Sequence, residues 1–198
     1  KLNRKELKKL QATVIIMAGG KGVRLRPYTS VLPKPLMPIN DKPVIQHIIE
    51  QFNKHGENDF IITLNYKSDI LKSFFENLKT KTRKISLIYE KKPLGTAGSL
   101  FKIKKKVKEN FILTNCDTII KHNYSDILAS HVKNKNDLTI VVSEKKFVLP
   151  YGVCNYTKTK FLYSEKPSFN YKVNTGFYII SKSCLHLLKK EKDLDFNE

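Results

Sequence analysis

Short apolar runs alternate with amphipathic stretches along the chain as far as Ser143. The run Thr13–Met17 is apolar and β-branched, which is typical of a buried central strand. Further strands are expected at Asp59–Leu64, Ile85–Tyr89, Asn110–Thr114 and Leu138–Ser143. Between them, helices are expected over Pro43–His55, Ile70–Leu78, Gly95–Val107 and Tyr124–His131. This alternation predicts a parallel sheet that is covered by helices on both faces.

Beyond Ser143 the pattern changes to short strands with little helix between them. The expected strands are Tyr151–Asn155, Phe161–Ser164 and Val173–Ile180. Such a run is typical of an antiparallel layer. A last helix is expected over Ser181–Lys190, with Ser181 or Ser183 as its N-cap. The predicted fold class is therefore α/β, with a Rossmann-like, mostly parallel sheet sandwiched by helices and a small antiparallel sub-layer over the ligand cleft.

The first expected strand ends at a glycine-rich turn, Ala18-Gly19-Gly20-Lys21-Gly22. Glycine allows positive φ and lets the backbone approach a ligand closely. Successive backbone N–H groups in such a turn form a concave site for anions. Three cations follow within a dozen residues, namely Arg24, Arg26 and Lys34. Two of them are arginines, of which the whole chain has only four. This combination suits a polyphosphate ligand.

Four prolines shape the segment after the glycines: Pro27, Pro33, Pro35 and Pro38. Because proline fixes φ and disfavours helix, we expect a rigid, ordered loop without helix. The segment is not a Walker A loop, since no Gly-Lys-Ser/Thr follows at the required spacing. It is not a complete dinucleotide fingerprint either, because Leu25 stands where the third glycine belongs.

The compound pattern resembles the signature of the nucleotide-sugar pyrophosphorylases, also called sugar-1-phosphate nucleotidyltransferases. The matching motifs are Ala-Gly-Gly-x-Gly-x-Arg-Leu at 18–25, Pro-x-Thr at 27–29 and Pro-Lys-Pro-Leu at 33–36. The resemblance extends over roughly residues 12–198. It is closest to the guanylyltransferase-like branch that is associated with CBS domains. Residues 12–198 are therefore expected to form a C-terminally incomplete catalytic domain, and residues 1–11 the remnant of a linker from a preceding domain.

The resemblance implies roles for residues on the nucleotide side. The Gly19–Gly22 amides and Arg24 would hold the β- and γ-phosphates, and Lys34 would hold the α-phosphate. The base-binding segment of the family matches Leu94–Gly98. The nucleotide-binding residues expected from these matches and from the base argument below are Ala18, Gly19, Gly20, Gly22, Glu90, Gly95, Thr96 and Gly98.

The resemblance also implies a sugar side, over which the antiparallel sub-layer would lie. Three family segments match Tyr151-Gly152-Val153, Glu165-Lys166-Pro167 and Asn174-Thr175-Gly176. By this match Lys166 pairs with the sugar phosphate and joins Arg24 and Lys34 as the expected catalytic residues. The expected sugar-binding residues are Gly152, Glu165, Asn174 and Thr175. Taken alone, Glu165-Lys166 would indicate only a surface turn.

Asp117 follows a predicted strand, at the end of a sheet where α/β folds place ligand chemistry. It resembles the strand-end aspartate of the family, which coordinates Mg²⁺, so we expect Mg²⁺ as the cofactor. Magnesium usually takes only one or two carboxylates together with phosphates and water. The family has a second metal-binding aspartate in a Trp-x-Asp-x-Gly-like segment, which is not present here. A catalytically silent domain that binds nucleotide sugars is therefore an alternative.

Glu90 follows the third strand and precedes the base-binding segment. Its carboxylate can accept two hydrogen bonds from the N1–H and N2 amine of guanine, which favours GTP. Alternatively, Glu90 pairs with a neighbouring lysine in solvent. Related branches use dTTP, UTP or CTP and share most of these motifs.

The chain has 198 residues and a formal net charge of +19. Such a charge invites a nucleic-acid function. The lysines are scattered and arginine is scarce, however, so we expect a solvated lysine-rich surface and no nucleic-acid partner. No apolar run approaches the roughly 20 residues of a membrane span, and Lys1–Gln11 lacks the apolar core of a signal peptide. The three cysteines form no metal or redox pair, which suits the cytoplasm.

These observations predict transfer of a nucleoside monophosphate from an NTP, favoured as GTP, to a hexose-1-phosphate of the glucose, glucosamine or mannose type. The products are an NDP-sugar and pyrophosphate. The expected partners are therefore NTP and sugar-1-phosphate, and the resemblance is compatible with a homo-oligomer and with N-terminal CBS regulatory domains. Other open alternatives are a nucleic-acid binder and an enzyme that transfers nucleotide to a lipid or protein acceptor.

Overall fold

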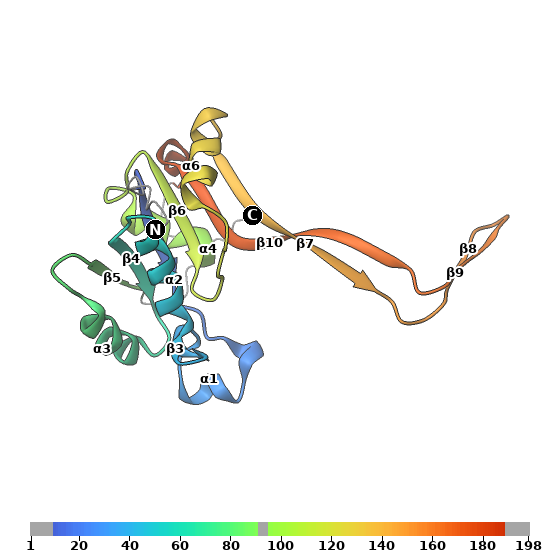
Figure 1. Ribbon diagram of the computed structural model, residues 1–198, viewed down its shortest axis with the longest axis horizontal. Helices are drawn as coiled ribbons and strands as arrows, with labels where there is room; N and C mark the ends of the chain where they lie inside the picture. Colours follow the sequence, from blue (N-terminus) through green and yellow to red (C-terminus); the bar gives the residue numbers. More distant parts are fainter. Residues whose placement is uncertain (1–9, 91–94, 189–198) are drawn as a thin grey trace, which may run out of the picture. The chain divides into compact units, whose positions relative to one another are not determined.

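The strand β1 (Ala12–Met17) lies inside a sheet whose strand order is β5-β4-β1-β6-β10-β7 (Figure 1). The computed structural model describes residues 10–90 and 95–188 of the 198-residue chain. β1 pairs in parallel with β4 (Asp59–Leu64) and with β6 (Asn110–Asn115). β5 (Lys84–Tyr89) pairs in parallel with β4, whereas β10 (Ser168–Ser181) pairs antiparallel with β6. The mostly parallel sheet with β1 at its centre confirms the prediction.

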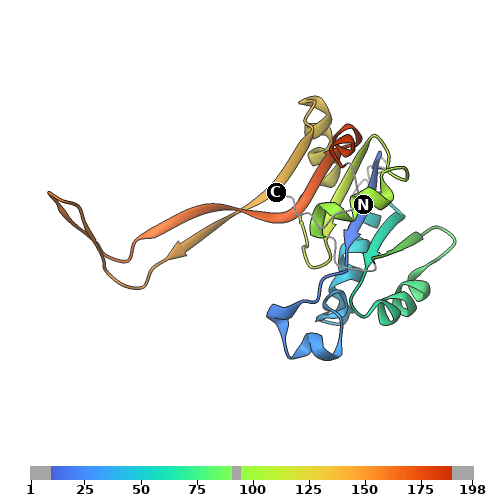
Figure 2. The ribbon, with the colours of Figure 1, turned by 180° about the vertical axis from the view of Figure 1, so that it is seen from behind.

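Helices cover both faces of this sheet. On one face Phe52, from α2 (Val44–Lys54), packs against Phe60 and Phe177, with ring centroids 6.1 and 6.2 Å apart. The neighbouring residues Ile61 and Tyr178 point to the other face, because side chains alternate along a strand. There they join a buried cluster that includes residues of α5 (Leu100–Ile103) and η3 (Lys182–Leu187). α2 crosses in front of the sheet in Figure 1, and Figure 2 gives the view from behind.

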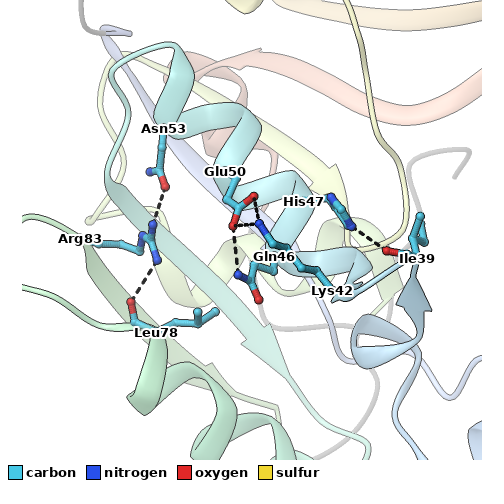
Figure 3. A network of polar contacts seen from close by, with 8 residues as sticks. All are labelled: Ile39, Lys42, Gln46, His47, Glu50, Asn53, Leu78 and Arg83. Atoms are coloured by element: carbon cyan, nitrogen blue, oxygen red, sulfur yellow. Dashed lines mark hydrogen bonds and ion pairs between the residues drawn. The ribbon is translucent and has the colours of Figure 1, made fainter.

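The bounds of α2 follow the amphipathic pattern of the sequence closely. It begins after Pro43, it buries five apolar side chains, and it ends just before Gly56, whose φ is 75°. Polar contacts hold its outer face (Figure 3): the Lys42 ammonium lies 3.1 Å from the Glu50 carboxylate, and Arg83 donates to the Asn53 side chain at 2.9 Å. α3 (Ser68–Leu78) and α6 (Tyr124–Lys133) likewise cover the stretches expected to be helical.

Two predicted elements differ in the structure. The helix expected over residues 95–107 is interrupted at Ser99, which separates α4 (Gly95–Gly98) from α5, and α5 ends at Ile103. The last helix is a 3₁₀ helix, η3, without a side-chain cap, and residues 189 and 190 lie outside the described residues. The expected linker at residues 1–11 also lies largely outside them.

The proline-rich loop is wrongly predicted to lack helix. It contains three short helical turns, η1 (Val23–Leu25), α1 (Tyr28–Val31) and η2 (Lys34–Leu36). Proline is tolerated at the start of a helix, where its missing N–H has no partner to lose. Pro27 and Pro33 occupy these N-cap positions. The short strands β2 (Pro38–Ile39) and β3 (Lys42–Pro43) then lead into α2.

Residues Ile140–Thr175 form a second compact unit, and the rest of the described chain forms the first. The second unit consists of the outer parts of β7 (Leu138–Val148) and β10 together with a separate antiparallel pair. This pair is β8 (Val153–Tyr156) and β9 (Phe161–Ser164). The predicted antiparallel strands are therefore confirmed, and β7 and β10 are longer than expected. Within the described residues, no helix combines the length and apolarity needed to cross a bilayer.

Candidate active site

A cavity of about 340 Å³ opens at the carboxyl ends of the parallel strands of the first unit. Open α/β sheets bind ligands at this edge, because their loops converge there. Met17, Thr63 and Asn115 line the cavity from the ends of β1, β4 and β6. Eight of the predicted site residues also line it: Gly19, Gly20, Gly22, Arg24, Lys34, Glu90, Gly95 and Asp117. Ala18 and Gly98 are buried but are not among the lining residues, and the side chain of Thr96 is outside the described structure.

The glycine turn forms one wall of the cavity. Of its three glycines only Gly22 has a positive φ, 63°, which corrects the expectation for Gly19 and Gly20. A Cβ on Gly22 would lie 2.9 Å from Thr29 Cγ2 and 3.1 Å from Lys34 Cβ. The buried Thr29 hydroxyl donates to the Gly22 carbonyl at 3.0 Å. Gly22 is therefore required where the turn packs against α1 and Lys34, whereas a Cβ on Gly20 would meet no atom within 4 Å.

Lys34 and Asp117 form an ion pair in the cavity. Lys34 begins η2, Asp117 follows β6, and Lys34 Nζ lies 2.5 Å from Asp117 Oδ2. Their side chains are 23% and 35% exposed, so both charges remain accessible to a ligand. Arg24 adds an exposed guanidinium from η1. These three residues thus place two cations and one carboxylate in the cavity together with the backbone of the glycine turn.

Cys116 lines the same cavity between Asn115 and Asp117. Burial raises the pKa of its thiol to about 12, and the Asp117 carboxylate adds to the effect while Lys34 opposes it. The thiol therefore stays protonated at neutral pH, and a thiolate is the form that acts as a nucleophile or metal ligand. Cys116 therefore lines the cavity without acting as a reactive group.

Asp117 is the residue that fits a metal ion. Among the described residues, no group of three His, Cys, Asp or Glu side chains converges as a metal cage would require. A hard divalent ion that is bound with substrate phosphates needs fewer protein ligands, since phosphates and water complete its oxygen shell. One carboxylate in a cavity that Arg24 and Lys34 also line is compatible with this requirement.

Glu90 also lines the cavity, beside Gly19 of the glycine turn. It is 9% exposed, and its Oε2 lies 3.6 Å from the position that a Cβ on Gly19 would occupy. Its backbone carbonyl accepts a hydrogen bond of 2.7 Å from the Asn65 side chain. This burial argues against the alternative of a side chain in open solvent. Gly95, with φ 68°, lines the cavity at the start of α4.

The expected sugar-side residues all belong to the second unit, which is described by itself. There Tyr163 donates a short hydrogen bond to Glu165 and lies where a Cβ on Gly152 would clash. Lys166 has φ 42°, which is uncommon for a residue other than glycine. The Thr175 hydroxyl donates to the Val141 carbonyl at 2.7 Å. Glu165 and Lys166 lie in the bend between β9 and β10, and their roles toward a sugar, like that of Asn174, stay predictions.

Sequence reasoning gave no role to several residues that shape the cavity. Thr63 is the penultimate residue of β4, and its position near the carboxyl end of a parallel strand was the available signal. Val23 and Leu25 line the cavity from η1, although they are 55% and 41% exposed. Tyr66 and Lys67, which follow β4, contact the carbonyls of α1, and no sequence motif marks them.

Residues 13–197 match the nucleotidyl transferase family. The mannose-1-phosphate guanylyltransferase catalytic subunit beta of Xenopus tropicalis is 34% identical over 180 residues, which cover 86% of this chain and 50% of that protein. The chain therefore spans about half the length of this curated relative. The D-glycero-alpha-D-manno-heptose 1-phosphate guanylyltransferase of Aneurinibacillus thermoaerophilus is 30% identical over 189 residues, 93% of this chain and 81% of the relative.

A solved structure agrees with these relatives. HddC from Yersinia pseudotuberculosis, crystallised in complex with GMP-PN, has a TM-score of 0.73 and 28% sequence identity. The similarity covers 93% of this chain and 83% of HddC. The resemblance noted in the sequence is confirmed, while the association with CBS domains stays a prediction. The chain belongs to the nucleotidyl transferase family.

Proposed function

We propose that residues 12–198 belong to the catalytic domain of a sugar-1-phosphate guanylyltransferase. The reaction is GTP plus a hexose-1-phosphate to a GDP-sugar plus pyrophosphate. The observation that carries the proposal is the cavity in which the Lys34–Asp117 pair faces the glycine turn. The relatives named as guanylyltransferases support the choice of base and of a manno-configured sugar.

The chemistry follows from where the charges lie. A phosphate oxygen of the sugar-1-phosphate attacks the α-phosphorus of GTP in line, the new P–O bond forms, and the bond to the pyrophosphate oxygen breaks. The attacking phosphate is already an anion at neutral pH, so no general base is required. Among the described residues that line the cavity there is no histidine, which fits this requirement.

Charge neutralisation and positioning are then the main tasks of the protein. The backbone N–H groups of residues 19–22 and the Arg24 guanidinium bind the β- and γ-phosphates. Lys34 leaves Asp117 and donates to the α-phosphate, where negative charge develops. Asp117 is then free to hold Mg²⁺, which would supply further charge neutralisation at the phosphates. Lys166 binds the sugar phosphate and offsets its repulsion from the triphosphate.

Base and sugar are bound by neutral and acidic groups. Glu90, buried at the cavity wall, accepts hydrogen bonds from guanine N1–H and N2 beside Gly95. Glu165 and Asn174 accept and donate hydrogen bonds at the sugar hydroxyls, with Gly152 and Thr175 in the same segments. We further propose that the enzyme acts in the cytoplasm, since all three cysteines are free thiols.

The proposal is tested with a panel of GTP, ATP, UTP, CTP and dTTP against glucose-, glucosamine-, mannose- and manno-heptose-1-phosphate, with Mg²⁺. Pyrophosphate release is the readout, and the full-length protein is used. We expect the highest kcat/KM with GTP and a manno-configured sugar phosphate. Binding of GDP-sugars without any pyrophosphate release would favour the silent binding domain. Release with a pyrimidine nucleotide above GTP would overturn the choice of base.

A further inference from the structure

The short helix α1 lies between the two cations of the nucleotide cavity, Arg24 and Lys34, yet it buries little apolar surface. Tyr28 and Val31 are 71% and 78% exposed, and Thr29 is the one buried residue of its four. Since apolar burial is the main force that holds a segment in place, α1 is not held by packing alone. Polar contacts must position it.

These contacts come from the turn that follows β4. Lys67 Nζ donates to the carbonyls of Ser30 and Val31, at 2.5 and 2.7 Å. The neighbouring Tyr66 hydroxyl donates to the Thr29 carbonyl at 3.3 Å. The last carbonyls of a helix lack partners within the helix and form its negative end. An ammonium group that bonds two of them makes the stronger, charge-assisted kind of hydrogen bond.

The turn that carries Lys67 is itself fixed to the sheet. The Asn65 side chain donates to the Glu90 carbonyl at 2.7 Å, and the Tyr66 N–H donates to the Gly19 carbonyl at 3.4 Å. Lys67 has φ 52° and ψ 40°, a left-handed conformation that is disfavoured for a side chain with a Cβ. Asparagine and glycine adopt it more readily. Lys67 therefore occupies a backbone position that suits other residues better.

α1 is coupled to both ends of the loop in which it lies. Thr29 bonds the Gly22 carbonyl, and the stem of Lys34 packs beside Gly22. We propose that Lys67 is a positioning residue that holds residues 22–36, here called the phosphate loop, so that Arg24 and Lys34 face the cavity. The role in catalysis rests on the proposed function, whereas the tether itself does not.

Four variants separate the tether from other effects of the substitution. Lys67→Met keeps the aliphatic stem and removes the donors, and Lys67→Arg keeps the donors. Lys67→Gly also removes the donors but suits the left-handed backbone. Lys72→Met is the matched control, because Lys72 is an exposed lysine of α3, the helix that Lys67 precedes. The readouts are amide hydrogen exchange over residues 23–36, the Kd for GTP by calorimetry, and the KM for the sugar-1-phosphate.

We expect Lys67→Met and Lys67→Gly to speed exchange in the phosphate loop by tenfold or more and to raise the Kd for GTP at least fivefold. The KM for the sugar-1-phosphate should change by less than twofold, and Lys67→Arg and Lys72→Met should match the wild type. Wild-type exchange and affinity in Lys67→Met would overturn the proposal. Wild-type affinity for GTP in Lys67→Gly would also overturn the proposal. The weaker binding of Lys67→Met would then be assigned to the backbone conformation at residue 67 and not to the lost hydrogen-bond donors. A wild type that binds no GTP would refute the proposed function, and the exchange data would still decide the tether.

Discussion

Lys34 and Asp117 form an ion pair, with 2.5 Å between Nζ and Oδ2, at the point where the glycine turn meets the end of β6. Both side chains are partly exposed. A solvent-accessible pair of this kind contributes only about 0–1 kcal/mol to folding. The pair therefore contributes little to stability, and its position in the cavity fits the chemistry at phosphate oxygens that we propose.

Replacing either partner should lower activity far more than stability. We expect Lys34→Ala and Asp117→Ala each to reduce kcat by about a hundredfold or more, equivalent to about 3 kcal/mol of transition-state stabilisation. Thermal unfolding should shift by only a few degrees, because each variant loses one exposed ion pair. Pyrophosphate release and a thermal melt of the same preparation check both expectations.

The exposed pair of Lys79 and Glu76, at 2.9 Å, provides the control. Lys79→Ala removes a comparable ion pair outside the cavity and should leave kcat unchanged. Near-wild-type turnover in Lys34→Ala or Asp117→Ala would refute the assignment of these two residues.

Lys166→Ala tests the sugar side. Because Lys166 is proposed to bind the sugar phosphate, its loss should raise the KM for sugar-1-phosphate and leave that for GTP nearly unchanged. Loss of one charge-assisted contact costs roughly 1.5–3 kcal/mol, or about ten- to hundredfold. Lys172→Ala, in an exposed position on β10, serves as the control. A larger rise in the KM for GTP would mean that the two subsites have been exchanged.

Glu90→Gln tests the base. The amide keeps the shape of the carboxylate but replaces one acceptor with a donor, which opposes the guanine N–H groups. A mismatched buried polar group costs roughly 1–3 kcal/mol, so the preference of kcat/KM for GTP over ATP and UTP should fall about ten- to hundredfold. Glu50→Gln, on the outer face of α2, should leave the preference unchanged. An intact guanine preference in Glu90→Gln would remove Glu90 from the site.

The sequence predicted the sheet well where the apolar pattern was strong. The strand at 59–64 has the expected bounds because it is mostly apolar and buried on both faces. The outer parts of β7 and β10 carry mostly exposed side chains. The pattern of apolar positions in the sequence therefore did not mark the full length of these strands. Ser99 interrupts the expected third helix, and serine is common enough within helices that it gave no warning.

The cavity was predicted through its motifs rather than through periodicity. The glycine turn, Lys34 and Asp117 all belong to recognisable patterns and all line the cavity. Lys67 belongs to none, since a lysine after a strand is ordinarily a solvated side chain. Its partners are backbone carbonyls 36 and 37 residues earlier in the chain, which carry no residue identity that a sequence could reveal.

His131 should make the stability of the fold depend on pH. It is 1% exposed, with Nδ1 2.8 Å from Thr139 Oγ1 and Nε2 3.1 Å from Ser181 Oγ. The Ser181 hydroxyl donates to the Asn136 carbonyl, so it accepts from His131, and the neutral ring has its proton on Nε2. Burial lowers the pKa of His131 from its ordinary 6.5, and Asp137 acts in the opposite direction.

Because the folded state resists protonation, the unfolded chain binds more protons between the lowered pKa and 6.5. The contribution to stability is complete above pH 6.5 and is lost as the pH falls through this window. His131→Gln should therefore flatten the dependence of the free energy of unfolding on pH between about 7 and 5, measured by urea denaturation. His122→Gln, at an exposed position, should leave this pH dependence unchanged. An unchanged slope in His131→Gln would contradict the prediction.

Two glycines of the same turn should respond in opposite ways to alanine. At Gly22, with φ 63°, the new Cβ would lie 2.9 Å from Thr29 Cγ2. The left-handed backbone alone costs roughly 1–2 kcal/mol, so Gly22→Ala should lower the melting temperature by several degrees. At Gly20 the new methyl would meet no atom within 4 Å and φ is not positive, so the free energy of unfolding should be unchanged or rise by up to about 1 kcal/mol.

Gly20 lines the cavity, however, and the methyl would occupy space that we assign to the triphosphate. Gly20→Ala should therefore melt at or above the wild-type temperature while its Kd for GTP rises severalfold. Wild-type affinity in Gly20→Ala would show that the triphosphate does not lie against this wall of the cavity.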